Sequence, residues 1–175
     1  MHYIKCILMH PLATNGARVG ISEFTHLISG VTKELSRRAL DEQLEAHLNQ
    51  VLPASGAPFQ QIFDACRAAI AEGWMCQRSA GGIRYGRVLK PTPDLDQFSV
   101  DVVEMNEVVG PHHAHPKGEI DMVMPIDADA QFDGYKAGWL VYAPNTAHRP
   151  TVTGGRALVL YLLPDGAIDF TLPPA

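Results

Sequence analysis

The spacing of apolar residues changes near residue 76, and this change limits the possible folds more than any other feature of the chain. Before it, three stretches place apolar residues every three or four positions, which is typical of amphipathic helices. After it, apolar and polar residues alternate in short stretches separated by turn-forming residues, which is typical of antiparallel strands. The sequence therefore predicts a helical segment over residues 21–75 and a mainly β domain, an antiparallel barrel or sandwich, over residues 76–175.

The three apolar stripes predict helices over residues 24–35, 40–51 and 59–70. Ser22 is the expected N-cap of the first helix, and Pro53 is expected to end the second. The apolar faces can form a surface for a partner, or they can pack against one another and against the β domain, which is what we expect. Residues 1–20 show no sustained period and contain turn formers such as Pro11, so we expect a loosely tethered leader.

Five stretches of the second part are predicted strands, namely residues 83–88, 98–103, 118–126, 138–143 and 157–163. Asp133-Gly134 lies between two of them and predicts a tight hairpin turn, because these two residue types tolerate positive φ angles. No internal repeat interrupts this series of strands, so a single β domain is expected.

Composition excludes several classes of function. The net charge is −5 and no basic stripe is present, which disfavours a protein that binds nucleic acid. The three cysteines show no CxxC spacing, so neither a disulfide framework nor a thiolate zinc site is predicted, and a reducing compartment is expected. No apolar run approaches the roughly 20 residues of a membrane span, and His10-Pro11 ends the only short apolar stretch near the start. We expect a cytoplasmic protein without membrane partners.

Four of the eight histidines fall within one stretch of the β domain, and three of them have the spacing of metal ligands. His113 and His115 are two residues apart, so their rings point to the same face of an extended strand. Glu119 follows a Pro-Lys-Gly turn that can fold the next strand back beside them, and His148 can supply a fourth ligand. Three imidazoles and one carboxylate suit a divalent metal ion, which can be Fe, Mn, Zn, Ni or Co.

These motifs resemble those of the cupin superfamily, whose members are antiparallel jelly-roll barrels with a metal ion at the mouth. His113-x-His115-x₃-Glu119 resembles the first cupin motif, and Gly138-x₅-Pro144 with His148 resembles the second. Thr146 stands where the second motif has a glycine. The resemblance implies a single cupin domain preceded by the helical segment, and by fold analogy it implies a homo-oligomer, taken as a dimer.

A closer resemblance covers roughly residues 22–172. The segments GGIRYGRVLKP, FSVDVVEMNEVVGPHHAHPKGEIDMVMPID, FDGYKAGWLVYAPNTAHRPTV and GGRALVLYLLP together resemble the 4-hydroxylaminobenzoate lyase family. This resemblance implies a lyase of nitroaromatic (4-nitrobenzoate) degradation that converts 4-hydroxylaminobenzoate and water into protocatechuate (3,4-dihydroxybenzoate) and ammonia. It also implies a small aromatic acid as the binding partner.

Such a reaction needs groups that transfer protons beside the metal. Asp121 shares the parity of Glu119, so its side chain is expected to point into the barrel, where it can act as a general acid or base or can pair with an inward arginine. His112 faces away from His113 on an ideal strand and is expected to be a solvent-exposed or supporting histidine, unless a bulge exchanges the two roles. Tyr161 can share in proton transfer or can simply pack in the core.

The substrate also needs a partner for its carboxylate and for its ring. Arg149 is the first candidate for the carboxylate because it follows His148 directly. Arg84 and Arg87 are alternatives of opposite parity, so only one of them can face the site. Trp139 and Tyr142 can stack on the ring or can simply pack in the barrel. Tyr85 is a further substrate-binding candidate, and like Tyr161 it can share in proton transfer.

Two other functions use the same residues. A cupin dioxygenase that opens an aromatic ring would use the same ligands with Fe²⁺, and it would consume oxygen. A non-catalytic cupin that binds a small aromatic acid, or a sensor of such an acid, would bind without turnover.

Overall fold

A computed structural model describes residues 20–170 of the 175-residue chain, so all but the last residue of the expected leader, residues 1–20, lie outside the described part. The described chain forms three helices followed by antiparallel strands, and the predicted mainly β fold is confirmed. None of these helices has the length and apolar character that crossing a membrane requires.

The helices are α1 (Ile21–Leu35), α2 (Glu42–Val51) and α3 (Ala57–Ala71). Asp41 caps α2, because its side chain accepts hydrogen bonds from the backbone N–H groups of Gln43 and Leu44. The predicted N-cap Ser22 is wrong. Gly20 takes that place in an extended conformation, and its carbonyl oxygen already accepts a bond from the N–H of Phe24, so Ser22 lies inside the first turn.

The strands are β1 (Arg78–Ala80), β2 (Ile83–Leu89), β3 (Phe98–Val109), β4 (His113–His115), β5 (Glu119–Pro125), β6 (Gln131–Phe132), β7 (Gly138–Tyr142), β8 (Thr146–His148) and β9 (Thr151–Pro164), with a 3₁₀ turn at Pro93–Leu95. The large sheet has the order β1-β2-β3-β9-β5-β7, and β6 pairs with β9. β4 and β8 form a separate two-stranded sheet. All five predicted strands are present, and the short strands β1, β4, β6 and β8 are additional.

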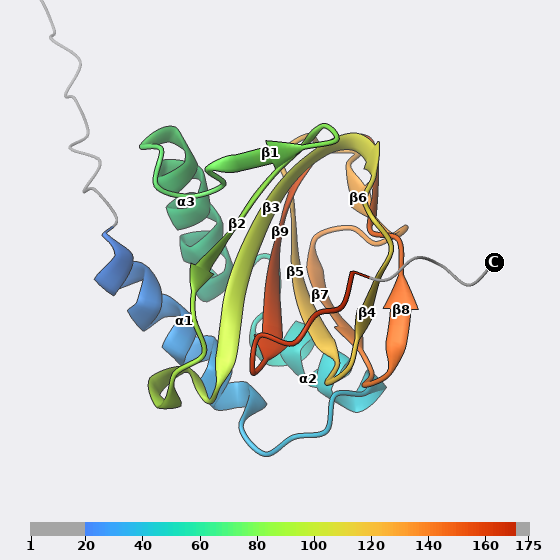
Figure 1. Cartoon of the computed structure of the whole chain (residues 1–175). Helices are drawn as coiled ribbons and strands as arrows, with labels where there is room; N and C mark the ends of the chain where they lie inside the picture. Colours follow the sequence, from blue (N-terminus) through green and yellow to red (C-terminus); the bar gives the residue numbers. More distant parts are fainter. Residues whose placement is uncertain (1–19, 171–175) are drawn as a thin grey trace, which may run out of the picture.

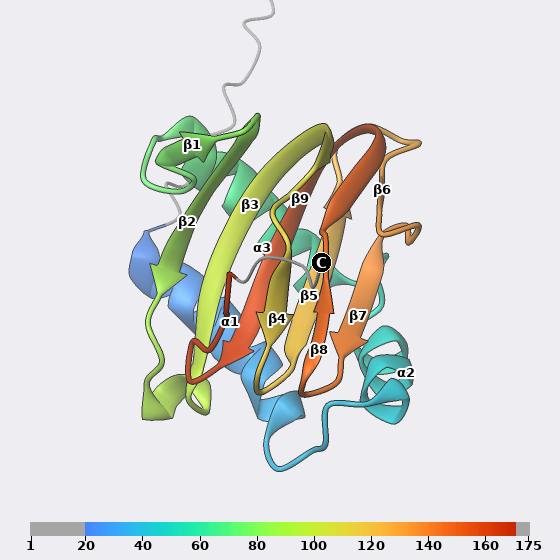
Figure 2. The same cartoon turned by 45° about the vertical axis from the view of Figure 1, so that its right-hand side comes forward.

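The large sheet is covered on both faces (Figure 1). The helices lie against one face, where alternate residues of β3, β5 and β9 join the helices in one apolar core. The β4–β8 sheet lies across the other face, and Figure 2 shows it in front of β5 and β9. The two sheets face each other as in a cupin-type jelly roll, but within residues 20–170 hydrogen bonds do not join them into a closed barrel.

Two side chains of α2 bond to the outer edge of the large sheet. Asn49 donates to the carbonyl oxygen of Trp139 at 2.8 Å and accepts from the N–H of Trp139 at 3.0 Å. Glu45 accepts from the N–H of Val141 at 3.0 Å. α2 therefore pairs with the backbone of β7 much as a further strand would.

The predicted turn at Asp133-Gly134 is confirmed as a tight reversal. Both residues have positive φ angles, 49° and 85°, as a type I′ turn requires. The flanking residues Phe132 and Tyr135 exchange two backbone hydrogen bonds of 2.9 and 2.8 Å. The reversal directly follows β6 rather than joining two of the predicted strands.

Candidate metal centre

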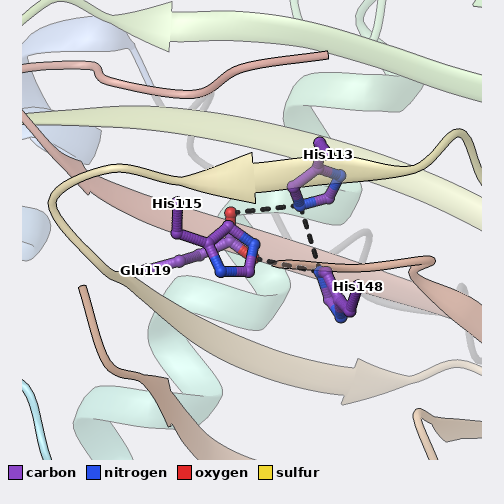
Figure 3. Close-up of side chains that lie close together, drawn as sticks. All are labelled: His113, His115, Glu119 and His148. Carbon is purple, nitrogen blue, oxygen red and sulfur yellow. Dashed lines mark hydrogen bonds and ion pairs between the residues drawn. The ribbon is translucent and has the colours of Figure 1, made fainter. Parts of the chain in front are cut away.

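Three strands bring the predicted ligands together between the two sheets (Figure 3). His113 and His115 lie on β4, and His148 lies opposite His113 on β8. Glu119 is the first residue of β5 in the large sheet. One ligand atom from each of the four residues lies within 4.8 Å of the others. The alternation of β4 explains this convergence, because residues two apart point to the same face.

The four side chains meet at the carboxylate of Glu119. Its oxygens lie 3.5 Å from His113 Nε2, 3.4 Å from His115 Nε2 and 3.6 Å from His148 Nε2. The Nε2 atoms of His113 and His148 are 3.0 Å apart. All three imidazoles therefore present the same ring nitrogen to one point.

The unpaired atoms of this cluster fit a bound cation. His115 Nε2 and both carboxylate oxygens of Glu119 are buried, and none of them has a hydrogen-bond partner among residues 20–170. Buried polar atoms without partners are costly, and a cation would satisfy them together. Ligands about 2.0–2.2 Å from a metal lie roughly 3–4 Å from one another, which matches the distances of the cluster.

The cluster shifts the pKa values of its members in different directions. Burial lowers the pKa of His115 to about 4. Burial also opposes protonation of His148, but its contacts with the carboxylates of Asp133 and Glu119 raise its pKa to about 9. Burial alone would raise the pKa of Glu119, yet the surrounding imidazoles hold it below its ordinary value. Glu119 is therefore ionised at neutral pH, as a metal ligand must be.

Asp121 lies two residues after Glu119 and is fully buried on the same face of β5. Neither of its carboxylate oxygens has a hydrogen-bond partner among the described residues, and no inward arginine pairs with it. Burial raises its pKa well above the usual value, and the charges of Glu119 and Asp133 raise it further. Its cross-strand neighbour is Tyr161, which is also buried on this face.

Three other predicted residues occupy different places. His112 precedes β4, is half-buried and is not among the four clustered ligands, so no bulge exchanges it with His113. Tyr142 faces the cluster, with its ring centroid 4.5 Å from that of His148. Trp139 does not face the cluster, contrary to expectation. Its ring packs against Phe59 of α3 and donates from Nε1 to the Leu52 carbonyl oxygen, because odd residues of β7 point to the helices.

The three candidate arginines lie in different positions relative to the cluster. Arg84 lies opposite Glu104 on the face that carries the helices and pairs with it at 2.7 Å, so it points away from the cluster. Arg149 is exposed beyond the end of β8 and makes no side-chain hydrogen bond or ion pair with residues 20–170. Arg87 lies opposite Asp101, which is itself opposite Tyr161, so Arg87 shares the face of the cluster. Tyr85, two residues before Arg87 and opposite Val103, lies on the same face.

Sequence reasoning missed two partners of the ligands. Asp133, for which the sequence predicted only a place in a tight turn, lies with Oδ2 2.6 Å from His148 Nδ1. Thr146 lies with Oγ1 3.0 Å from His115 Nδ1. The departure of Thr146 from the cupin pattern was the only signal in the sequence for either contact.

Residues 169 and 170, the last that the structure describes, lie beside β4. Asp169 exchanges two backbone hydrogen bonds with Ala114 of β4, at 2.7 and 3.0 Å. The next residue, Phe170, places its ring centroid 5.7 Å from that of His113 and remains 66% exposed. An aromatic surface therefore lies beside the cluster.

Comparison with known proteins adds the family. A family model described as "PnbB: 4-hydroxylaminobenzoate lyase" matches residues 26–170. The chain belongs to the 4-hydroxylaminobenzoate lyase family. A 4-hydroxylaminobenzoate lyase of Nocardioides sp. (strain LMS-CY) is 31% identical to it over 150 residues, which are 81% of this chain and 89% of that protein. A 4-hydroxylaminobenzoate lyase of Pseudomonas putida is 28% identical over 150 residues, which are 76% of this chain and 85% of that protein.

Membership in the lyase family agrees with the resemblance that the sequence motifs predicted. Among solved structures, an RmlC-like cupin protein from Ralstonia eutropha JMP134 aligns with 49% of this chain and 57% of its own, with 11% identity and a TM-score of 0.38.

Proposed function

We propose that this member of the lyase family converts 4-hydroxylaminobenzoate and water into protocatechuate and ammonia at the His113, His115, Glu119 and His148 cluster. The observation that carries the proposal is the convergence of these four side chains in a chain that belongs to this family. The reaction balances, since a net of one water enters and one ammonia leaves. The N–O bond breaks and its oxygen leaves as water, one water adds at the neighbouring ring carbon, and a second water replaces the nitrogen, which leaves as ammonia. Two waters enter and one leaves, so the net uptake is one water.

The four residues of the cluster would hold a divalent metal ion. Such an ion supplies a Lewis acid and a water that ionises near neutral pH. Glu119 brings one negative charge to the site, and the three imidazoles bring none when neutral. The ion and its four ligands together would therefore carry one net positive charge, which suits an anionic substrate.

Asp121 is the proposed proton donor. Because burial and neighbouring carboxylates keep it protonated, it can give a proton to the N-hydroxyl oxygen, which then leaves as water. Asp121 lies two residues after Glu119 on the same face of β5, and therefore beside the cluster. Tyr161, the cross-strand neighbour of Asp121 on β9, can hand a proton on to it.

Arg87 is the proposed partner of the substrate carboxylate. A row of cross-strand neighbours on this face runs from Asp121 through Tyr161 and Asp101 to Arg87. Three strand spacings separate the ends of the row, roughly 14 Å between backbones. Arg87 Nε binds Asp101 and one Nη binds the Gly166 carbonyl oxygen, while Nη1 has no partner among the described residues and can donate to a carboxylate.

The aromatic groups around the cluster suit a benzene ring. Tyr142 and Phe170 each stack near a ligand histidine, and both are proposed to contact the substrate ring. Arg149 and Tyr85 lie nearer to solvent and are proposed only as residues of the rim.

The test is an assay on 4-hydroxylaminobenzoate without oxygen, with protocatechuate and ammonia measured together. We expect equal amounts of both products from the metal-loaded protein, and loss of both in His113→Ala and Glu119→Gln. His47→Ala is the matched control, since His47 pairs with Glu34 on the helices and lies outside the cluster.

Three results would contradict the proposal. Full activity after removal of metal by a chelator would exclude the metal role. Oxygen consumption coupled to turnover would indicate the dioxygenase, and tight binding of benzoate without turnover would indicate a binding protein.

A further inference from the structure

We propose that Thr146 and Asp133 are positioning residues that fix the ring tautomers of His115 and His148 and thereby set the metal affinity of the site. The proposal rests on the metal role proposed above. A neutral imidazole carries its proton on either ring nitrogen, and only a ring with its proton on Nδ1 can bind a cation through Nε2. The question is therefore what each Nδ1 contacts.

Thr146 restricts His115 to one ring tautomer. The Thr146 hydroxyl lies 2.7 Å from the carbonyl oxygen of Ala143, and because a carbonyl can only accept, the hydroxyl donates its single proton there. The same oxygen lies 3.0 Å from His115 Nδ1, so it can only accept from that nitrogen. His115 therefore holds its proton on Nδ1 and presents the bare Nε2 to Glu119.

Asp133 does the same for His148. As a carboxylate it can only accept hydrogen bonds, and its Oδ2 receives the proton of His148 Nδ1 at 2.6 Å and that of the Tyr142 hydroxyl at 2.7 Å. Its Oδ1 accepts from the backbone N–H of Thr151 at 2.7 Å. His148 Nδ1 therefore keeps its proton whether the ring is charged or neutral, so Nε2 is the nitrogen that gives up its proton when a cation binds.

The tight turn holds Asp133 in place. Its own N–H donates to the carbonyl oxygen of Thr151 at 2.8 Å, and Gly134 completes the reversal. Asp133 is therefore tied to β9 by two backbone contacts and to β7 through Tyr142. A carboxylate held this firmly can orient a ring without moving to follow it.

His113 differs from the other two histidines in the surroundings of its Nδ1. Its Nδ1 is buried and has no hydrogen-bond partner within residues 20–170. Two of the three imidazoles thus have a specific acceptor at Nδ1, and the third has none there among the described residues.

The experiment compares Zn²⁺ affinity, measured by competition with a chromogenic chelator, across four variants. Thr146→Val keeps the shape but removes the acceptor, and Asp133→Asn keeps the shape but removes the charge. We expect each to weaken Zn²⁺ binding by about 10–100-fold, the usual effect of losing a partner of a ligand histidine. Thr146→Ser keeps the hydroxyl and should stay within about 3-fold of the parent protein. Thr153→Val is the matched control on exposed β9 surface and should change nothing.

A second measurement does not depend on metal. Long-range ¹H–¹⁵N spectra of the metal-free protein near neutral pH report which nitrogen of His115 carries the proton. We expect the Nδ1–H form in the parent protein and in Thr146→Ser, and a mixture of both forms in Thr146→Val. The position of the proton on His115 would not change in Thr146→Val if Thr146 were only a packing residue.

The outcomes separate the two proposals. Unchanged Zn²⁺ affinity in both Thr146→Val and Asp133→Asn, or an Nε2–H form of His115 in the parent protein, would overturn the positioning roles. If the parent protein binds no Zn²⁺, Co²⁺ or Fe²⁺, the metal role fails. The spectra of His115 then still decide whether Thr146 fixes its tautomer.

Discussion

Glu119 and Asp121 lie two residues apart on one face of β5, both fully buried, and their pKa values move in opposite directions. Three imidazoles surround Glu119 and favour its ionised form. Asp121 has no hydrogen-bond donor among the described residues and lies near other carboxylates, so burial keeps it neutral. Two carboxyl groups on the same face thus have different protonation states, because only Glu119 contacts the histidines.

This difference predicts how stability depends on pH in the metal-free protein. Asp121 stays protonated in the folded state at pH values where the unfolded chain, with an ordinary aspartate pKa, is ionised. Folding then takes up a proton, so this carboxyl group lowers the free energy of unfolding as pH rises above about 4, by at most about 1.4 kcal/mol per pH unit. Asp121→Asn cannot ionise and should gain stability relative to the parent protein as pH rises.

Urea unfolding of both proteins with chelator present, between about pH 5 and pH 8, measures this difference. Equal pH slopes would show that Asp121 is ionised in the folded protein. The same variant should lose turnover of 4-hydroxylaminobenzoate, because an amide has no acidic proton to donate.

Trp139→Phe should reduce stability and leave the affinity for substrate unchanged. The indole Nε1–H donates to the Leu52 carbonyl oxygen at 2.8 Å, and a phenyl ring leaves that oxygen without its donor. We expect a loss of about 1–3 kcal/mol in the free energy of unfolding. KM should stay unchanged because the ring packs against α3, so a large rise in KM would contradict this placement.

Two glycines with similar backbone angles should respond differently to alanine. Gly134 (φ +85°) has open space around it, whereas a Cβ on Gly154 (φ +74°) would lie 2.3 Å from the Asp129 carbonyl oxygen. Gly134→Ala should cost about 1–2 kcal/mol from the left-handed conformation alone. Gly154→Ala should cost a further 1–3 kcal/mol or so, because backbone atoms must move apart. Equal losses in thermal or urea unfolding would show that the contact with Asp129 relaxes freely.

Cys66 and Cys76 should resist alkylation in the folded protein. Both thiols are buried, and burial raises the pKa of Cys66 far above its usual value and that of Cys76 to about 12. Only the thiolate reacts with iodoacetamide, so labelling should require unfolding in guanidinium. Peptide mapping of native and denatured samples checks this, and rapid native labelling of either peptide would contradict the packing.

The alternation of residues predicted the long strands, and with them the shared face of Glu119 and Asp121. It did not predict which face of β7 meets the helices. β5 and most of β7 are buried on both faces, so the pattern of apolar residues does not distinguish the face toward the helices from the face toward the cluster. Trp139 was therefore assigned to the cluster face, although it lies on the helix face. β4 and β8 have three residues each, too few to show a period, and only the ligand spacing marked them.

The contact between Asp133 and His148 could not be predicted from the sequence for another reason. Asp133 and His148 are 15 residues apart, and they meet only because the tight turn and the start of β9 fold back together. A turn residue that is exposed in most proteins is here held between three donors. Such contacts depend on the three-dimensional path of the chain and leave no periodic signal.

The hydrogen bonds from Asn49 and Glu45 to β7 affect whether a second chain can add a strand at this edge of the sheet. A sheet edge with free N–H and C=O groups serves as a template for another strand, and it is a common starting point for aggregation. At β7 the N–H and C=O groups of Trp139 and the N–H of Val141 are bonded to α2, which covers this edge. The other end of the large sheet is β1, with only three residues to offer. Strand addition at β7 would therefore require α2 to detach first, so α2 protects this edge of the folded domain against aggregation.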